Sequence, residues 1–152
     1  MGARFSKWGV LFALLVLTAC SDQRAAVEIK GGATTLTLIR ITGMPWQKTA
    51  KYDVVAARMP DCMRRHAMGE AALGASVEVY APGNDAWILK QGKRMFVVET
   101  RTCEGFAKLD KVPDTGLGPL LGAFEMRADT LVFSAAPLPE PAAAGSGGAA
   151  AN

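Results

Sequence analysis

The sequence is poor in the side chains on which most enzymes depend. It contains one histidine, His66, and three cysteines among 152 residues, and aromatic side chains make up 7% of it. Between residues 34 and 134 the only serines are Ser76 and Ser134, and neither lies in a nucleophile-elbow pattern. A Ser-His-Asp hydrolase is therefore not expected. We predict that the protein is not an enzyme and uses no cofactor.

Long apolar runs and an excess of one charge are also missing. The apolar segment at residues 10–17 is too short to cross a membrane, because a spanning helix needs about 20 apolar residues. Residues 20–152 carry 15 Lys and Arg against 14 Asp and Glu, because Arg4 and Lys7 precede Cys20. A clustered basic face is not expected from this balance, so nucleic acid is not a predicted partner.

The N-terminus has the layout of a secretory signal, with Arg4 and Lys7 before the apolar segment. It ends in Leu17-Thr18-Ala19-Cys20, which resembles the lipobox of bacterial lipoproteins. The resemblance implies that residues 1–19 are removed as a signal peptide and that the Cys20 thiol takes a diacylglycerol. It also implies that the new amine receives an acyl chain such as palmitate, and two or more chains make membrane attachment stable. The alternative is an ordinary signal peptide followed by a chance cysteine.

Composition predicts the domain boundaries. Residues 21–33 are largely polar and include Gly31-Gly32 near their end, so within residues 20–33 we expect the lipidated cysteine to be followed by a flexible tether. Residues 135–152 are rich in Ala, Gly and Pro, which is typical of a disordered tail, and residues 34–134 remain as one globular domain.

The residue after Cys20 bears on the target membrane. It is Ser21, whereas Asp at that place resembles the inner-membrane retention signal of enteric bacteria. The expected location in a Gram-negative cell is the periplasmic face of the outer membrane.

The cysteine count agrees with export. Once Cys20 carries lipid, Cys62 and Cys103 remain as a pair. In an oxidising compartment such a pair is expected to form a disulfide.

The globular part is predicted to be α+β, with a small antiparallel sheet and one or two packed helices. Residues 34–42 favour a strand, residues 76–101 a three-stranded meander, and residues 129–134 a closing strand. Residues 52–59 fit either a helix or a strand.

Two details of this prediction depend on spacing. If Gln91-Gly92 is a two-residue hairpin loop, Trp87 lies opposite Phe96 and Ile88 opposite Met95. A helical stripe of apolar side chains then predicts a helix packed on the sheet, formed by Leu117, Leu120, Leu121 and Phe124.

One segment has side chains suited to a metal, with ligands Met59, Cys62, Met63, His66 and Met68. Thioether, thiolate and imidazole ligands suit Cu(I), and on a helix Cys62 and His66 share a face. A disulfide would consume the thiolate, and the adjacent Arg64 and Arg65 would repel a cation.

These observations leave two classes of function. The favoured one is a non-catalytic envelope lipoprotein that binds a protein partner or helps to assemble an envelope structure. Aromatic anchors dominate many interfaces, so Trp46, Tyr80 and Trp87 are candidate contacts wherever they are exposed. The alternative is a periplasmic ligand-handling protein that binds copper or senses redox state through the segment at 59–68.

Overall fold

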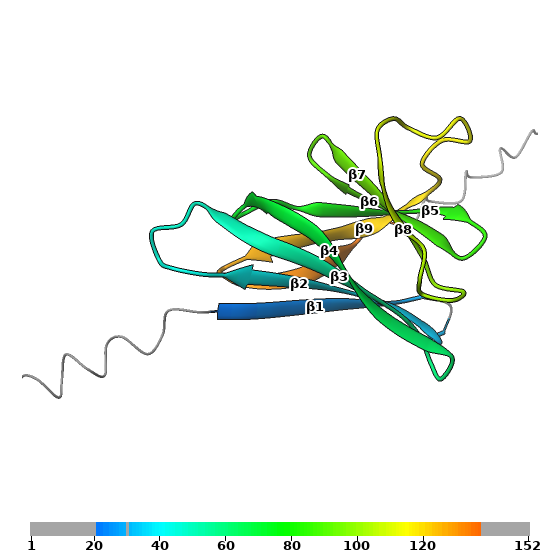
Figure 1. Ribbon diagram of the computed structural model, residues 1–152, viewed down its shortest axis with the longest axis horizontal. Coiled ribbons are helices and arrows are strands. Elements are labelled where there is room, and N and C mark those ends of the chain that lie inside the picture. Colours follow the sequence, from blue (N-terminus) through cyan, green and yellow to red (C-terminus); the bar gives the residue numbers. More distant parts are fainter. Residues whose placement is uncertain (1–20, 30, 138–152) are drawn as a thin grey trace, which may run out of the picture.

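The computed structural model describes residues 21–29 and 31–137, and these residues form ten strands and no helix. The predicted α+β class is therefore wrong, and the described part is all-β. It consists of two antiparallel sheets that share one core (Figure 1). The described residues contain no helix capable of spanning a membrane.

The first sheet has four strands in sequence order. They are β1 (Ser21–Ile29), β2 (Thr34–Thr42), β3 (Thr49–Arg58) and β4 (Cys62–Ala72).

The second sheet has six strands in the order β10-β9-β5-β6-β7-β8. They are β5 (Val77–Gly83), β6 (Ala86–Gln91), β7 (Arg94–Glu99), β8 (Phe106–Leu109), β9 (Leu120–Arg127) and β10 (Thr130–Ala135).

The core lies between the two sheets. Side chains alternate between the faces of a strand, so every second residue of the central strands points inward. The largest fully buried side chains of this shared core include Leu36, Leu38, Tyr52, Val54, Val77, Val79, Leu89, Val98 and Phe124.

The meander predicted over 76–101 is confirmed, since β5, β6 and β7 pair in turn. Asn84 and Asp85, with φ of 56° and 57°, make the two-residue turn between β5 and β6. The predicted register of the next hairpin is wrong, because Gln91 pairs with Arg94 and the loop is Gly92-Lys93. The positive φ of 59° at the first loop position is taken by Gly92 instead of Gln91.

As a result, Trp87 lies opposite Val98 and Ile88 opposite Val97. The predicted closing strand is also present, as β10. It pairs with β9 through a two-residue turn at Ala128 and Asp129, both with positive φ.

The helix predicted from Leu117 to Phe124 is absent. Gly116 and Gly118 both have φ of +78°, which is incompatible with a right-handed helix. Residues 120–127 instead form β9, where Phe124 points into the core and Leu120 is exposed. The segment at 52–59, which fitted either structure, lies mostly in β3.

The tether predicted over 20–33 is replaced by strand β1. Along β1 the partly buried side chains are Gln23, Ala25, Val27 and Ile29, and the residues between them are exposed. This period of two is a strand signal that the polar composition obscured. Gly31 and Gly32, both with positive φ, form the turn into β2.

The two sheets form a β-sandwich, and its described part extends past residue 134. Ala135 ends β10, and the backbone N–H of Ala136 donates to the Leu121 carbonyl at 2.8 Å. The remainder of the predicted tail, residues 138–152, and the predicted signal peptide with Cys20 lie outside the described residues.

The two sheets are joined at both sides. On one side Gln23 donates from Nε2 to the Asp129 carbonyl at 2.6 Å, which links β1 to the turn before β10. On the other side a disulfide links β4 to the loop after β7. The start of β1 and the loop between β2 and β3 lie at the same end of the molecule, and the β3–β4 turn lies at the opposite end (Figure 1).

Candidate functional site

The predicted disulfide between Cys62 and Cys103 is confirmed. Its Cα atoms are 5.9 Å apart, and it joins residues separated by 41 positions. Cys62 begins β4 at the edge of the first sheet, whereas Cys103 is a buried residue in the loop between β7 and β8 of the second. The bond therefore ties the two sheets together where no strand pairing does.

His66 lies beside the disulfide and is held by its neighbours. Its Nε2 donates to the Cys103 carbonyl oxygen at 2.8 Å. Its ring stacks on Phe106 with centroids 4.9 Å apart, and Phe106 in turn stacks on Phe96 at 5.6 Å. The Arg94 guanidinium also lies over the Phe96 ring, 5.6 Å from its centroid. This arrangement gives His66 a structural role between the sheets.

The structure does not bring the five candidate copper ligands together. Segment 62–68 is a strand, so Met63 points away from the face shared by Cys62 and His66. Met59 and Met63 are exposed at the β3–β4 turn, whereas Met68 is buried in the core. The Cys62 sulfur is bonded to Cys103. No group of three or more His, Cys, Asp or Glu residues suited to a metal occurs among the described residues.

Glu99 was not singled out by its sequence, yet it organises the loop that carries Cys103. Its carboxylate accepts hydrogen bonds from the backbone N–H groups of Arg101 at 2.7 Å, Thr102 at 3.1 Å and Gly105 at 3.2 Å, and from the Thr102 hydroxyl. These bonds lower the pKa of Glu99 to about 2, the Thr102 hydroxyl contributing most. The ionised carboxylate therefore fixes the turn from which Cys103 reaches β4.

We expect Glu99→Gln to destabilise the fold by about 1.5 kcal/mol at pH 7, the lower end for hydrogen bonds to a charged group, since Glu99 is only partly buried. Because the folded-state pKa of Glu99 is depressed, its contribution is present above the ordinary value of 4.5. It is lost as the pH falls through about 2. Urea unfolding between pH 7 and pH 2 tests this. The variant should lose less stability over that window than the wild type does.

Glu104→Gln is the matched control, because this nearby carboxylate is 73% exposed and pairs with Arg64 at the surface. Its free energy of unfolding should stay within about 0.5 kcal/mol of the wild type. Equal slopes against pH for Glu99→Gln and the wild type would contradict the role of Glu99.

Among the described residues, the most exposed aromatic side chain lies at the end of the two sheets away from the disulfide. Residues 43–48 connect β2 to β3, and within them Trp46 is 76% and Met44 47% exposed. Gln47 donates its backbone N–H to the Met44 carbonyl at 3.0 Å, and its side-chain oxygen accepts from the Met44 N–H at 3.1 Å. This closes a tight turn with Pro45 and Trp46 at its tip. The 43–48 loop is therefore pre-shaped to present Trp46.

Gly43 leaves room for the Gln47 side chain that accepts from Met44. A Cβ at Gly43 would lie 2.2 Å from Oε1 of Gln47, the atom that accepts from Met44. A side chain at residue 43 would push Gln47 away. The spacing of Gly43, Pro45 and Gln47 is a sequence signal for this turn.

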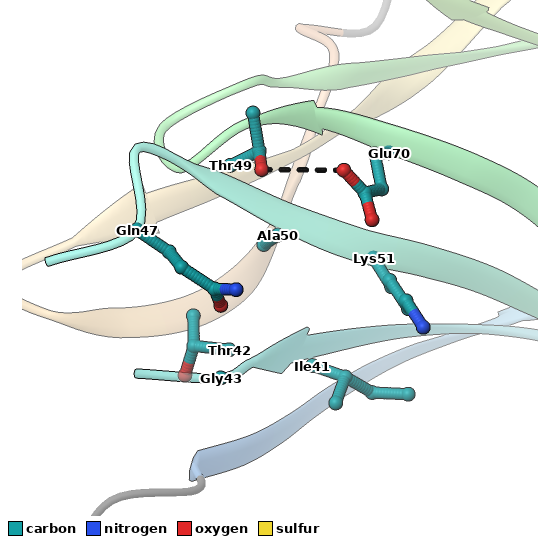
Figure 2. Close-up of a pocket in the computed structure, with 8 residues that line it drawn as sticks. All are labelled: Ile41, Thr42, Gly43, Gln47, Thr49, Ala50, Lys51 and Glu70. Carbon is teal, nitrogen blue, oxygen red and sulfur yellow. Dashed lines mark hydrogen bonds between the residues drawn. The ribbon is translucent and has the colours of Figure 1, made fainter. Parts of the chain in front are cut away.

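Two small pockets flank the 43–48 loop. The first has a volume of about 220 Å³ and lies between the loop and β3 and β4, where Thr49 donates to Glu70 at 3.4 Å (Figure 2). The second has a volume of about 340 Å³ and extends from the loop to Ser21 and Asp129. Pockets for drug-sized ligands usually have about 300–1,000 Å³. The first pocket is smaller than this range, and the second lies at its lower end.

Arg40 lines the second pocket and is only 8% exposed. Its Nε donates to the Leu73 carbonyl at 2.8 Å, and its Nη1 donates to Oε1 of Gln23 at 3.2 Å. These bonds connect β2 with β1 and with the loop before β5. Arg40 therefore fixes the start of β1 to the rest of this end.

The three aromatic candidates differ in exposure. Trp46 is exposed, Tyr80 is partly buried, and Trp87 is buried at 4% with its Nε1 donating to the Thr100 hydroxyl at 3.0 Å. Only Trp46 is therefore free to act as a large aromatic contact.

Comparisons with protein-family models, curated proteins and solved structures find no match to this chain.

Proposed function

We propose that the protein is a lipid-anchored lipoprotein of the cell envelope, held through Cys20 on the periplasmic face of the outer membrane. The observation that carries this proposal is the position of β1. The strand begins at Ser21, the residue after Cys20, and pairs along its full length with β2. Acyl chains on Cys20 would hold the sandwich by the end of an edge strand, close to the membrane, without an intervening tether.

Two further features support export and a non-catalytic role. A disulfide between the sheets suits an oxidising compartment. His66 is bonded to Cys103 and stacked on Phe106, which favours a structural use of this imidazole over general acid–base chemistry.

We further propose that the sandwich binds a protein partner at the end away from Ser21. The β3–β4 turn at that end exposes Met59 at 62% and Met63 at 68%. Exposed methionines form adaptable apolar contacts. A sandwich fixed by Cys20 would direct this turn away from its own membrane.

Cys20→Ser is expected to move the protein from the membrane to the soluble envelope fraction, because the variant has no thiol to receive lipid. Membrane fractionation and intact-mass measurement test this. Wild-type protein should carry the added mass of acyl chains and sediment with membranes. Ser21→Ala is the control and should remain attached. A wild-type mass that shows unmodified Cys20 would contradict the proposal.

A further inference from the structure

We infer that the 43–48 loop is a second membrane contact, with Trp46 and Met44 lying in the interface of the same bilayer that holds the lipid on Cys20. This inference rests on the proposed function, because the anchor brings the loop to a membrane.

The proposed anchor and the 43–48 loop lie close together. Ser21 pairs with Thr42, and the Thr42 hydroxyl donates to the Ser21 carbonyl at 3.0 Å. Thr42 is the last residue before the 43–48 loop, and Cys20 is one peptide unit, about 3.8 Å, from Ser21. Acyl chains on Cys20 therefore enter the bilayer within a few residues of the loop.

The side chains of the loop suit a membrane interface. Trp is enriched at membrane–water interfaces because its ring is apolar and its N–H remains hydrated. The exposed Trp46 and Met44 lie on a turn that two hydrogen bonds already close, so little conformational entropy is lost on insertion.

The surface around the loop carries charges of both signs. Lys48 and Lys51 at this end are accompanied by Glu70 and Asp129, so the surface around the loop is of mixed sign. Apolar insertion, and not attraction to anionic lipid, is then the driving force. Contact should occur on zwitterionic vesicles and persist in high salt.

The geometry also fixes an orientation. Ala57, the partner of Met63, is eight residues along β3 from Thr49, which at about 3.3 Å per residue places Met63 about 26 Å from the loop end of the sheet. With the anchor and loop at one end, the sandwich stands on that end and Met63 remains in water.

The test uses the full lipidated protein reconstituted into phosphatidylcholine vesicles whose acyl chains carry bromine, which quenches tryptophan on contact. After Cys20 the chain has two tryptophans, exposed Trp46 and buried Trp87. Wild-type protein should lose the share of emission that Trp46 contributes, relative to unbrominated vesicles. The Trp46→Phe variant should lose none.

The matched control moves the tryptophan to the opposite end. Trp46→Phe combined with Met63→Trp should float with the vesicles and remain unquenched, because residue 63 stays in water. Quenching equal to that of the wild type would overturn the inference, since the sandwich would then not stand on its anchored end.

Two further outcomes separate this inference from the proposed function. Lipidated wild-type protein that floats with the vesicles but shows no quenching would overturn the loop contact and leave the anchor intact. Protein that carries no lipid on Cys20 and does not float would overturn the anchor, and the loop contact with it.

Discussion

Replacing both Cys62 and Cys103 with alanine is expected to lower the free energy of unfolding by about 4 kcal/mol. The bond joins residues 41 positions apart, and on the chain-entropy model a loop of that length restricts the unfolded chain by about this amount. The double variant avoids leaving a free thiol. A loss of this size is a large share of the stability of a small domain.

Urea unfolding with and without a reductant, in the Cys20→Ser background, measures this effect. Reductant should shift the midpoint of the protein that retains Cys62 and Cys103 and leave the alanine variant unchanged. Peptide mapping of exported protein should recover the two cysteines as one crosslinked pair. Two free thiols, or a midpoint insensitive to reductant, would contradict the prediction.

The disulfide was predictable because it follows from parity and compartment, which the sequence contains. Its surroundings were not predictable. Glu99, which holds the loop around Cys103, acts through backbone N–H groups, and backbone donors have no sequence signature. The stacking of His66 on Phe106 joins residues 40 positions apart and required the arrangement of both sheets.

Strands were predictable where side chains alternate clearly and turn residues flank them. The β5–β6–β7 meander satisfies both conditions, with Asn84 and Asp85 between its first two strands. β1 was missed because only two of its four inward side chains, Val27 and Ile29, are large and apolar, so composition concealed the period of two. The loop with Trp46 was noted only as an aromatic candidate, because exposure is a property of the fold.

The prediction of a helix from Leu117 to Phe124 was wrong for a different reason. A stripe at i, i+3, i+4 and i+7 fits one face of a helix, but it ignores backbone conformation. Three glycines accompany this stripe, and all three have positive φ. Substitution of one of them, Gly122, distinguishes a helix from a strand here. The two structures predict changes in stability of opposite sign.

Gly122→Ala is expected to destabilise the protein by about 2–3 kcal/mol, as overpacking does at a close contact. Gly122 is in β9 between Val79 and Ala135, with φ of +153°. A Cβ there would lie 2.3 Å from the Ser134 carbonyl oxygen and 2.6 Å from Cζ of Phe133. The clash involves backbone of β10, so the two strands would have to separate. In a helix the same change would instead stabilise the chain by about 1 kcal/mol.

Gly74→Ala is the matched control, because its Cβ would meet no atom within 4 Å and its φ is not in the left-handed region. It should be neutral or stabilising by up to about 1 kcal/mol, since alanine restricts the unfolded chain. Thermal and urea unfolding of both variants and the wild type measure the sign of each change in the free energy of unfolding. A Gly122→Ala variant more stable than the wild type would support the helical interpretation and contradict the pairing of β9 with β10.

The pairing of β9 with β10 also sets the turn at Asp129, whose carbonyl accepts the hydrogen bond from Gln23 on β1. Loosening β10 by this substitution should therefore also weaken the attachment of β1 beside the proposed anchor.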